Sequence, residues 1–444
     1  MALPIIAPQS HNIYLLSFLT MLSKTDFFKL SLSIFSVLFL ITALTAAVID
    51  PRGMFHIVDI DGFNSKKASF LRYETFIKPY QAINSEASYV FLGDSRANTI
   101  FASSLEHRYF AGKPIYSAGM AGQSIYADYR MLQHIQDMHI TQMIVFVDHL
   151  SFFSSSPLNQ SIVKNNSEFS RRLNYNEDGG KNHTQWLQGF KDTALLLCSF
   201  NILQDSLETI QKQHSEGWYL LQNGTWGGGL AYDGKPQRKN FDYIERNFLL
   251  EPLADMPYTQ PFYESSEINT FSTLEKFITL AHDLKIKVEF IIPPVHARMF
   301  EVIFSMGRWQ DYENWKRTFV FTNEEIAKKL NDTPFTIWDF TAYNDITTEP
   351  VPQFNDKLTH MRWFYDDVHV QPALGEFMLN EMDHYTDDTY LVTKLTALSV
   401  EKNLANLYTG HNAYQQQQPK EVRQIYTFCL RVSKDSSRCT PPKN

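Results

Sequence analysis

The sequence has little cysteine and no cysteine–histidine pattern of the kind that binds zinc. Its 444 residues include three cysteines, and none lies at a zinc-ligand spacing from other cysteines or histidines. Cys198 falls in the apolar run "TALLLCSF", where we expect it to pack in the interior. Cys429 and Cys439 are ten residues apart, and an exported location would permit a disulfide between them. The cysteines therefore give no sign of a structural metal.

A block of basic residues is also missing. Lysine and arginine number 40 against 48 aspartate and glutamate residues, and the formal net charge is −8. Binding to a phosphate backbone requires clustered lysine and arginine, which argues against nucleic acid as the main partner. The hydrophobic share of 44% and the length are enough for a large globular core. Aromatic residues make up 14%, and they could fill that core or line a sugar-binding groove.

Long apolar runs without a charge that could cross a bilayer are lacking except for one, "LSLSIFSVLFLITALTAAVI", at residues 30–49. Twenty such residues are enough for a helix that crosses a bilayer. Lys24 and Lys29 precede the run, whereas Asp50 and Arg52 follow it, and this charge bias favours a cytoplasmic N-terminus. A cleavable signal peptide and a buried core helix are the alternatives. We predict a single-pass anchor in the cytoplasmic (inner) membrane, with the body in the periplasm or outside the cell.

Short apolar runs alternate with helical patterns in the rest of the chain. This alternation is typical of a parallel sheet with helices on both faces. The expected strands lie at residues 88–93, 113–119, 142–148, 287–294 and 335–340. The expected parts are an anchor (1–50), the two parts of an α/β domain (51–150 and 271–385), an insertion between them (151–270) and a C-terminal tail (386–444).

The insertion interrupts the alternation. We expect one long amphipathic helix around residues 182–214, followed by the glycine-rich stretch "NGTWGGGLAYDGK". A phosphate-binding loop is a poor interpretation of that stretch, because no Lys-Ser/Thr pair and no helix follow it. Trp186, Trp218 and Trp226 all fall in the insertion, where they could stack on sugar rings or pack the insertion onto the sheet.

The stretch "YVFLGDSRANTIF", residues 89–101, places Ser95 directly after an expected strand. Ser95 could be a nucleophile, or it could simply cap the helix that follows. A nucleophile needs a base to accept its proton and a third group to hold that base. The segment "DDVHVQPALG" supplies both, because Asp366 precedes His369 by three residues. That spacing allows the carboxylate to orient the imidazole, with Asp367 as the second choice for this role.

The two motifs belong together only if they meet in the fold. The carboxyl ends of parallel strands lie at one edge of a sheet, where ligand sites gather. Gly93-Asp94-Ser95 after an early strand, and Asp366-x-x-His369 near the end of the pattern, resemble the SGNH (GDSL) hydrolase superfamily. The stretches "GDSRA", "VFVDHLSFF", "PPVHARMFE", "IWDFTAYNDITTEP" and "YDDVHVQPALG" resemble membrane-anchored bacterial SGNH-like proteins. Some relatives of that layout modify cell-surface polysaccharides, and the resemblance covers about residues 87–150 and 270–382.

The resemblance implies a three-layer α/β/α fold with a flavodoxin-like parallel sheet. It also implies Ser95 as nucleophile, His369 as general base and Asp366 as the orienting acid. The stretch "YSAGMAGQS" is similar to the superfamily's second block, so the N–H groups of Ser95 and Gly119 would stabilise the oxyanion. Asp94 has no part in that triad and is expected to be structural.

The sequence departs from the superfamily at its third block, Gly-x-Asn-Asp, where it reads "FVDH" at residues 146–149. An ionised Asp148 would repel an oxyanion, so it can replace the missing asparagine only if it is protonated. The oxyanion hole then has two donors, or it takes a third from Asn98 or the insertion. His296 and Arg298 follow an expected strand end and could bind an anionic or sugar substrate, although a structural role at a helix start fits equally well.

The expected chemistry is acyl transfer through an acyl-Ser95 intermediate, with no metal or organic cofactor. The protein would be an esterase that removes acetyl groups, or an O-acyltransferase that acts on a surface glycan with a membrane partner as acyl donor. One alternative is a non-catalytic protein on the same scaffold that binds or assembles polysaccharide, since fold does not guarantee activity. A lipase that acts on the membrane itself is a third interpretation, disfavoured because the body has no apolar lid-like run.

Overall fold

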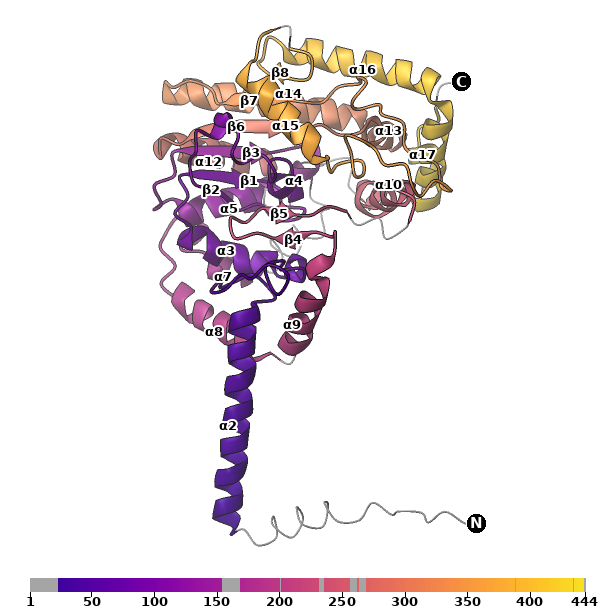
Figure 1. The fold of residues 1–444 in the computed structure, drawn as a ribbon. Coiled ribbons are helices and arrows are strands. Elements are labelled where there is room, and N and C mark those ends of the chain that lie inside the picture. The colour runs from indigo at the N-terminus through magenta and orange to yellow at the C-terminus, as the bar shows by residue number, and fades with distance from the viewer. Residues whose placement is uncertain are drawn as a thin grey trace, which may run out of the picture.

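The protein is described here from a computed structural model (Figure 1). The structure describes residues 23–153, 168–199, 201–230, 235–255, 262, 269–387, 389–433 and 435–442. The structure covers the glycine-rich stretch at residues 223–235 except for residues 231–234, which lie outside the described residues.

A six-stranded sheet forms the centre of the described body, in the order β2-β1-β3-β6-β7-β8. Its strands are β1 (Tyr89–Leu92), β2 (Ile115–Ser117), β3 (Gln142–Phe146), β6 (Lys287–Ile292), β7 (Thr336–Asp339) and β8 (Thr393–Lys394). The first five are parallel, and β8 pairs antiparallel with β7. In chain order the parallel strands run 2-1-3-4-5, the order found in flavodoxin-like sheets. The prediction of a parallel α/β sheet is confirmed.

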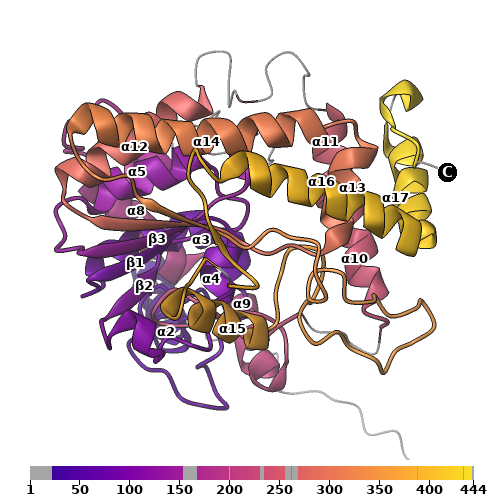
Figure 2. The same cartoon turned by 90° about the horizontal axis from the view of Figure 1, so that it is seen from above.

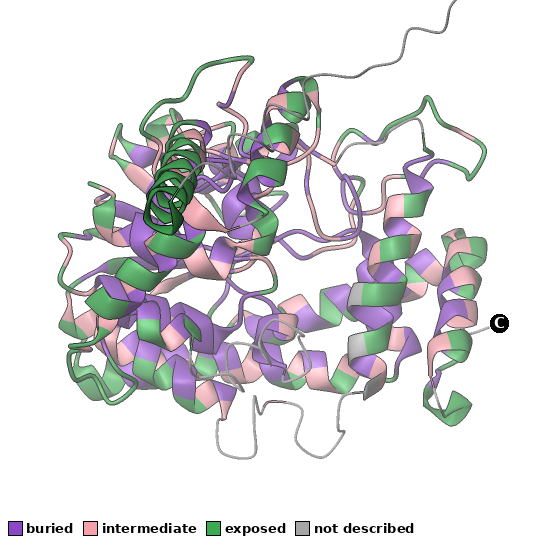
Figure 3. Ribbon diagram, turned by 90° about the horizontal axis from the view of Figure 1, so that it is seen from below, coloured by how far each residue is buried: buried purple, intermediate pink, exposed green. Residues whose placement is uncertain are grey.

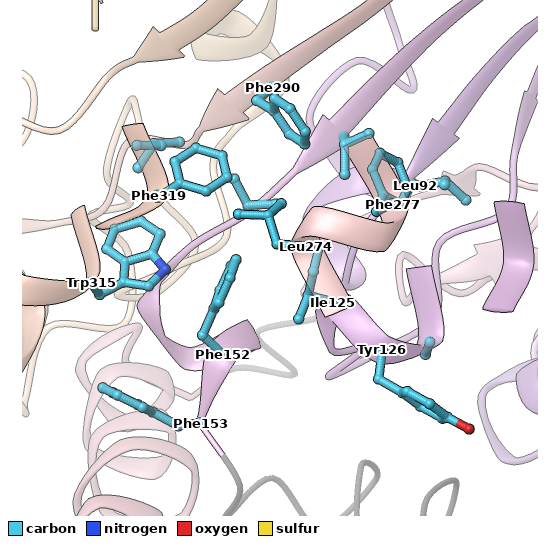
Figure 4. Packing of buried hydrophobic residues seen from close by; sticks show 14 of the residues in the cluster. Leu92, Ile125, Tyr126, Phe152, Phe153, Leu274, Phe277, Phe290, Trp315 and Phe319 are labelled. Atoms are coloured by element: carbon cyan, nitrogen blue, oxygen red, sulfur yellow. The ribbon is translucent and has the colours of Figure 1, made fainter. Parts of the chain in front are cut away.

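Helices cover both faces of this sheet, because residues on the short strands alternate between two apolar clusters. Figure 2 shows α5 (Ile125–Ile135), α12 (Thr270–Asp283) and α14 (Trp309–Leu330) on one side, and α4 (Ser95–Thr99) and α15 (Pro372–Asp383) on the other. On the first face, Phe290 of β6 lies 6.0 Å from Phe277 of α12 and 5.1 Å from Phe319 of α14, measured between ring centroids (Figure 4). Val90 and Leu92 of β1 join this cluster, whereas Tyr89 and Phe91 join the other.

The apolar run near the N-terminus forms α2 (Lys24–Ile49), which extends away from the body (Figure 1). An 18-residue window of α2 has a mean hydropathy of 2.5, and among the described helices α2 alone is long and apolar enough to cross a membrane. Side chains along most of α2 are exposed, as Figure 3 shows from below. Among the described residues, the contacts of α2 with the body bury side chains in its last two turns.

The insertion differs from its prediction. Instead of one long helix over 182–214, the structure has α8 (Gln185–Cys198) and α9 (Ile202–Gln211). Ser199 adopts an extended conformation after α8, and Ser199 and Asn201 both have low helix propensity, which accounts for the break. The other described elements here are α7 (Glu168–Arg172), β4 (Tyr219–Leu220), β5 (Trp226–Gly227), α10 (Arg238–Ile244), a π-helical segment (Glu245–Leu250) and α11 (Glu251–Asp255).

The described residues of the C-terminal tail pack into the body. The tail contributes the edge strand β8 and the helices α16 (Val400–Gln417) and α17 (Pro419–Val432), which pack against α13 (Ala297–Ser305) and α14. Its apolar side chains join the first core cluster, and Cys429 of α17 forms a disulfide with Cys439. The helix α3 (Glu74–Asn84) precedes β1 and packs beside α5 and α7.

Candidate active site

Ser95 is the first residue of α4, immediately after the turn that follows β1. Gly93 has φ +123°, and a Cβ there would lie 2.5 Å from the carbonyl oxygen of Phe146, so only glycine fits the turn. Asp94 is the N-cap of α4, because its carboxylate accepts the backbone N–H of Arg96. The interpretation of Ser95 as the helix cap is therefore wrong, and its hydroxyl is available for other contacts.

The hydroxyl of Ser95 contacts the imidazole of His369. Ser95 Oγ lies 2.9 Å from His369 Nε2, and His369 Nδ1 lies 2.8 Å from Asp366 Oδ2. The other carboxylate oxygen of Asp366 accepts the backbone N–H groups of Val368 and His369, both at 2.9 Å. Asp366 is fully buried, and the loop in front of α15 thus holds the acid and the base in one arrangement. The structure brings together the three residues that sequence analysis proposed for the triad.

The electrostatics of His369 suit a general base. Burial by itself lowers the pKa of His369, but the charge and hydrogen bond of Asp366 outweigh it, so the pKa is raised above 6.5. In the neutral ring, Nδ1–H donates to Asp366 and leaves Nε2 free to accept the Ser95 proton. This is the proton path that nucleophilic activation of a serine requires.

Asp367 was the second choice for the orienting acid, and the structure places it elsewhere. Its side chain is fully buried, and its pKa is raised well above the usual range by burial and by the nearby Glu245 carboxylate. The backbone carbonyl of Asp367 accepts the N–H of His296. Asp366, which bonds to His369, is therefore the better candidate for the orienting acid.

Gly119 lies just after β2 and packs against the turn that carries Ser95. A Cβ on Gly119 would lie 2.7 Å from Ala97 Cβ and 2.8 Å from the carbonyl oxygen of Gly93, so only glycine allows this approach. The side-chain amide of Asn98 donates to the Gly119 carbonyl at 3.1 Å. Asn98 is fully buried, and the contact makes it a support for the Gly119 loop.

Asn98 is itself held by two further groups. Its amide oxygen accepts from Ser117 Oγ at 2.7 Å and from Lys78 Nζ at 3.1 Å. Burial lowers the pKa of Lys78 to about 8, against the opposing effect of Glu74. Lys78 also donates to the Ser117 carbonyl at 2.8 Å. Sequence analysis missed Lys78, because it lies before the first expected strand and outside every motif that the sequence offered.

Asp148, where the resemblance to SGNH hydrolases leads us to expect an asparagine, forms an ion pair with Arg96 at 2.5 Å. Arg96 also pairs with Asp94, and it is 3% exposed. Burial raises the pKa of Asp148, but the Arg96 charge outweighs burial, so the net shift is downward. Asp148 is thus an ionised partner of Arg96 and does not supply the hydrogen-bond donor that an asparagine would.

His296 and Arg298 are placed in structural surroundings. His296 is the N-cap of α13, its Nε2 lies 2.8 Å from the Glu349 carbonyl, and burial lowers its pKa to about 3. Arg298 is fully buried and pairs with the carboxylates of Glu245 and Glu421. The structure brings neither residue into contact with the triad.

The three tryptophans of the insertion have different surroundings. The Trp218 ring lies 6.5 Å from the His369 ring and 5.4 Å from the Tyr365 ring, so the insertion reaches the triad. Trp226 is buried and donates to Glu74, whereas Trp186 on α8 is 67% exposed. Of the three, Trp218 is the one placed to contact a substrate at Ser95.

Two other features bear on ligands. A cleft of about 740 Å³ lies between residues 54–56, the end of α3 and residues 221–223, and no triad residue lines it. Among the described residues, no group of three or more His, Cys, Asp or Glu side chains is arranged to hold a metal ion.

Comparisons with known proteins do not assign the chain to a family. No protein-family model matches the chain, and no curated protein matches it. The resemblance to SGNH hydrolases therefore rests on the motifs and on the arrangement of the residues that carry them.

Proposed function

We propose that the protein catalyses acyl-ester chemistry through an acyl-Ser95 intermediate, as an SGNH-like esterase or O-acyltransferase. The observation that carries the proposal is the hydrogen-bonded series from Ser95 Oγ through His369 to Asp366, with contacts of 2.9 and 2.8 Å. It occurs where β1 ends and α4 begins, at the carboxyl edge of a parallel sheet, where ligand sites gather.

In the proposed reaction, Ser95 Oγ attacks the ester carbonyl carbon and its proton passes to His369 Nε2. The bond to the alcohol then breaks, and the leaving alcohol takes that proton, which leaves acyl-Ser95. In the second half, His369 removes a proton from water or from a sugar hydroxyl, whose oxygen attacks the acyl carbon. The bond between that carbon and Ser95 Oγ then breaks, and Ser95 takes the proton back from His369. The N–H groups of Ser95 and Gly119 are the proposed oxyanion donors. Water as acceptor gives an esterase, and a sugar hydroxyl gives an O-acyltransferase.

The proposed substrate is an acylated cell-surface glycan. The apolar helix α2 supports an anchor in the cytoplasmic membrane with the body outside it, where such glycans are found. Trp218 beside His369 offers an aromatic face of the kind that stacks on sugar rings. A membrane partner would supply the acyl group if the protein is a transferase.

A second candidate function is a non-catalytic protein that binds polysaccharide during its assembly. The observation that favours it is the Arg96–Asp148 ion pair, which stands where the superfamily has a donor to the oxyanion. This candidate predicts that Ser95, Asp366 and His369 can each be replaced without loss of function.

Ester turnover separates the two candidates. The full-length protein in detergent would be given a small activated acetyl ester, with and without an oligosaccharide acceptor, and free acetate and acetylated sugar would be measured. The proposal expects turnover that Ser95→Ala abolishes and that Ser103→Ala, an exposed serine in the same segment, leaves intact. If neither the parent protein nor Ser95→Ala turns over the ester, the binding-protein candidate would be favoured over the enzyme.

A further inference from the structure

Most of the large apolar side chains of α8 are exposed, whereas two of its polar side chains are buried. The exposed side chains include pairs that are three, four and eight residues apart, as residues on one helix face are. They are Trp186 (67% exposed), Leu187 (51%), Phe190 (77%) and Leu195 (49%). The buried face carries the polar Gln188 and Asp192, at 8% and 1% exposure, and one apolar residue, Leu196, at 2%. A water-soluble surface helix has the reverse arrangement.

Specific polar contacts fix this orientation of α8. Asp192 accepts from Tyr80 Oη at 2.6 Å and from Arg172 Nε at 2.7 Å. Gln188 donates to the same carboxylate at 2.7 Å. Because Asp192 is tied to the body in this way, the apolar face of α8 is directed away from the body.

The next helix, α9, repeats the arrangement. Leu203 and Leu207 are 50% and 56% exposed, whereas the buried face carries Asp205 at 6%, together with the apolar Ile202 at 1%. Asp205 bonds to Arg52 at 2.9 Å, three residues beyond the end of α2. That ion pair attaches α9 to the point where α2 enters the body.

Both helices pack against the C-terminal turns of α2 (Figure 1). Ala46 and Ile49 are buried there, whereas the side chains of residues 24–41 are exposed. The segment 57–60 lies beside the C-terminal end of α2, because Asn64 Nδ2 donates to the carbonyls of both Val48 and Val58 at 2.7 Å. It adds three exposed apolar side chains, Ile57 (65%), Val58 (37%) and Ile60 (50%).

The length of α2 determines how deep the exposed apolar side chains of α8, α9 and the segment 57–60 lie in a bilayer that α2 crosses. The uncharged run from 30 to 49 spans about 30 Å as a helix, which equals the thickness of a hydrocarbon core. The last two turns of that run are the ones that α8 and α9 cover. A bilayer that accommodates the whole run therefore extends to the exposed apolar faces of both helices.

We propose that α8, α9 and the segment 57–60 form a membrane collar, which inserts its apolar side chains into the outer boundary of the bilayer that α2 crosses. Amphipathic helices bind lipid interfaces in this way, and Lys191 on the exposed face can extend its amine to the headgroups. The collar fixes the orientation of the body on the membrane, which a single helix cannot do. The inference rests on α2 as a membrane span and is independent of the chemistry at Ser95.

The test uses the full-length protein in vesicles of phosphatidylethanolamine and phosphatidylglycerol. In a Cys198→Ser background, Phe190→Cys carries an environment-sensitive fluorophore, and Leu398→Cys serves as the matched control. Leu398 is also an exposed apolar residue, at 97%, but lies in the tail before α16. Both positions are exposed, so neither label disturbs the interior.

The collar predicts a blue-shifted Phe190→Cys label that is quenched by nitroxide-bearing lipids and shielded from aqueous iodide. The Leu398→Cys label is expected to behave in the opposite way. A Phe190→Cys label that iodide quenches as strongly as the control would overturn the proposal. A label shielded from both quenchers would also overturn it, because a protein partner would then cover the face.

Discussion

The neighbouring residues Asp366 and Asp367 provide a paired test of the triad, because the former alone of the two bonds to His369. In Asp366→Asn, the amide oxygen can still accept the backbone N–H groups of Val368 and His369, so the loop should stay folded. The amide NH2 would then donate to Nδ1 of His369 and force the ring proton onto Nε2. A protonated Nε2 cannot accept the proton of Ser95.

The expected loss follows from that tautomer. Where an acid of this kind is changed to its amide in a serine triad, the rate falls by about 10⁴-fold, or about 5 kcal/mol of transition-state stabilisation. Asp367→Asn should keep activity within about threefold, because burial raises the pKa of Asp367 and the protonated acid and the amide are both neutral.

The assay is the initial rate of ester hydrolysis by the full-length protein, supported by the rate of labelling with a fluorophosphonate. Thermal unfolding followed by circular dichroism would show that both variants are folded. Equal losses in the two variants, or full activity in Asp366→Asn, would refute the role given to Asp366.

Three further predictions concern pH, the Gly119 loop and the disulfide. The raised pKa of His369 places the rise of kcat/KM above pH 6.5, since the base must be neutral. The contribution of the His369–Asp366 ion pair to stability is complete below pH 6.5 and is lost as the pH rises through the pKa of His369. A pH series of rates and melting curves would show both effects. Gly119→Ala should lower the rate of ester hydrolysis and cost about 1–3 kcal/mol of stability in urea unfolding, because its Cβ would lie 2.7 Å from Ala97 Cβ. Changing Cys429 and Cys439 to serine should cost about 3 kcal/mol in the same urea experiment, from a loop of ten residues, while activity is kept.

Each of these predictions has a result that would contradict it. An activity midpoint below pH 6.5 would show that Asp366 does not govern His369. For the Gly119 variant, Gly189→Ala is the control, because its Cβ meets nothing closer than 3.5 Å and should be tolerated in α8. Normal activity in Gly119→Ala would remove the loop from the proposed oxyanion site. Unchanged stability of the double serine variant would show that the disulfide adds nothing to the tail.

The strands and the triad arrangement could be predicted because their signals are local. Buried strands such as Tyr89–Leu92 are continuous apolar runs, and the parallel order brings their ends to one edge. Asp366 and His369 are likewise only three residues apart, so their proximity on one tight loop can be predicted from four consecutive residues. Their contact with Ser95 needed only the further expectation that both loops lie at that edge.

Contacts between segments that are distant in the sequence could not be predicted in this way. The pairing of Arg96 with Asp148 joins two strand ends, and no pattern at either position signals it. Trp218 reaches His369 from the insertion, whose path the sequence leaves open. The same holds for α8, because its inverted burial depends on the partners of Asp192 in other helices.

The most direct test of the central claim is whether Ser95 becomes covalently modified. The full-length protein would be treated with a fluorophosphonate, in which the serine oxygen displaces fluoride at phosphorus, and its peptides analysed by mass spectrometry. We predict an adduct on Ser95 that forms rapidly in the parent protein and about 10³-fold or more slowly in His369→Ala. An unmodified Ser95 in a folded protein, or equal labelling without His369, would contradict the proposed nucleophile.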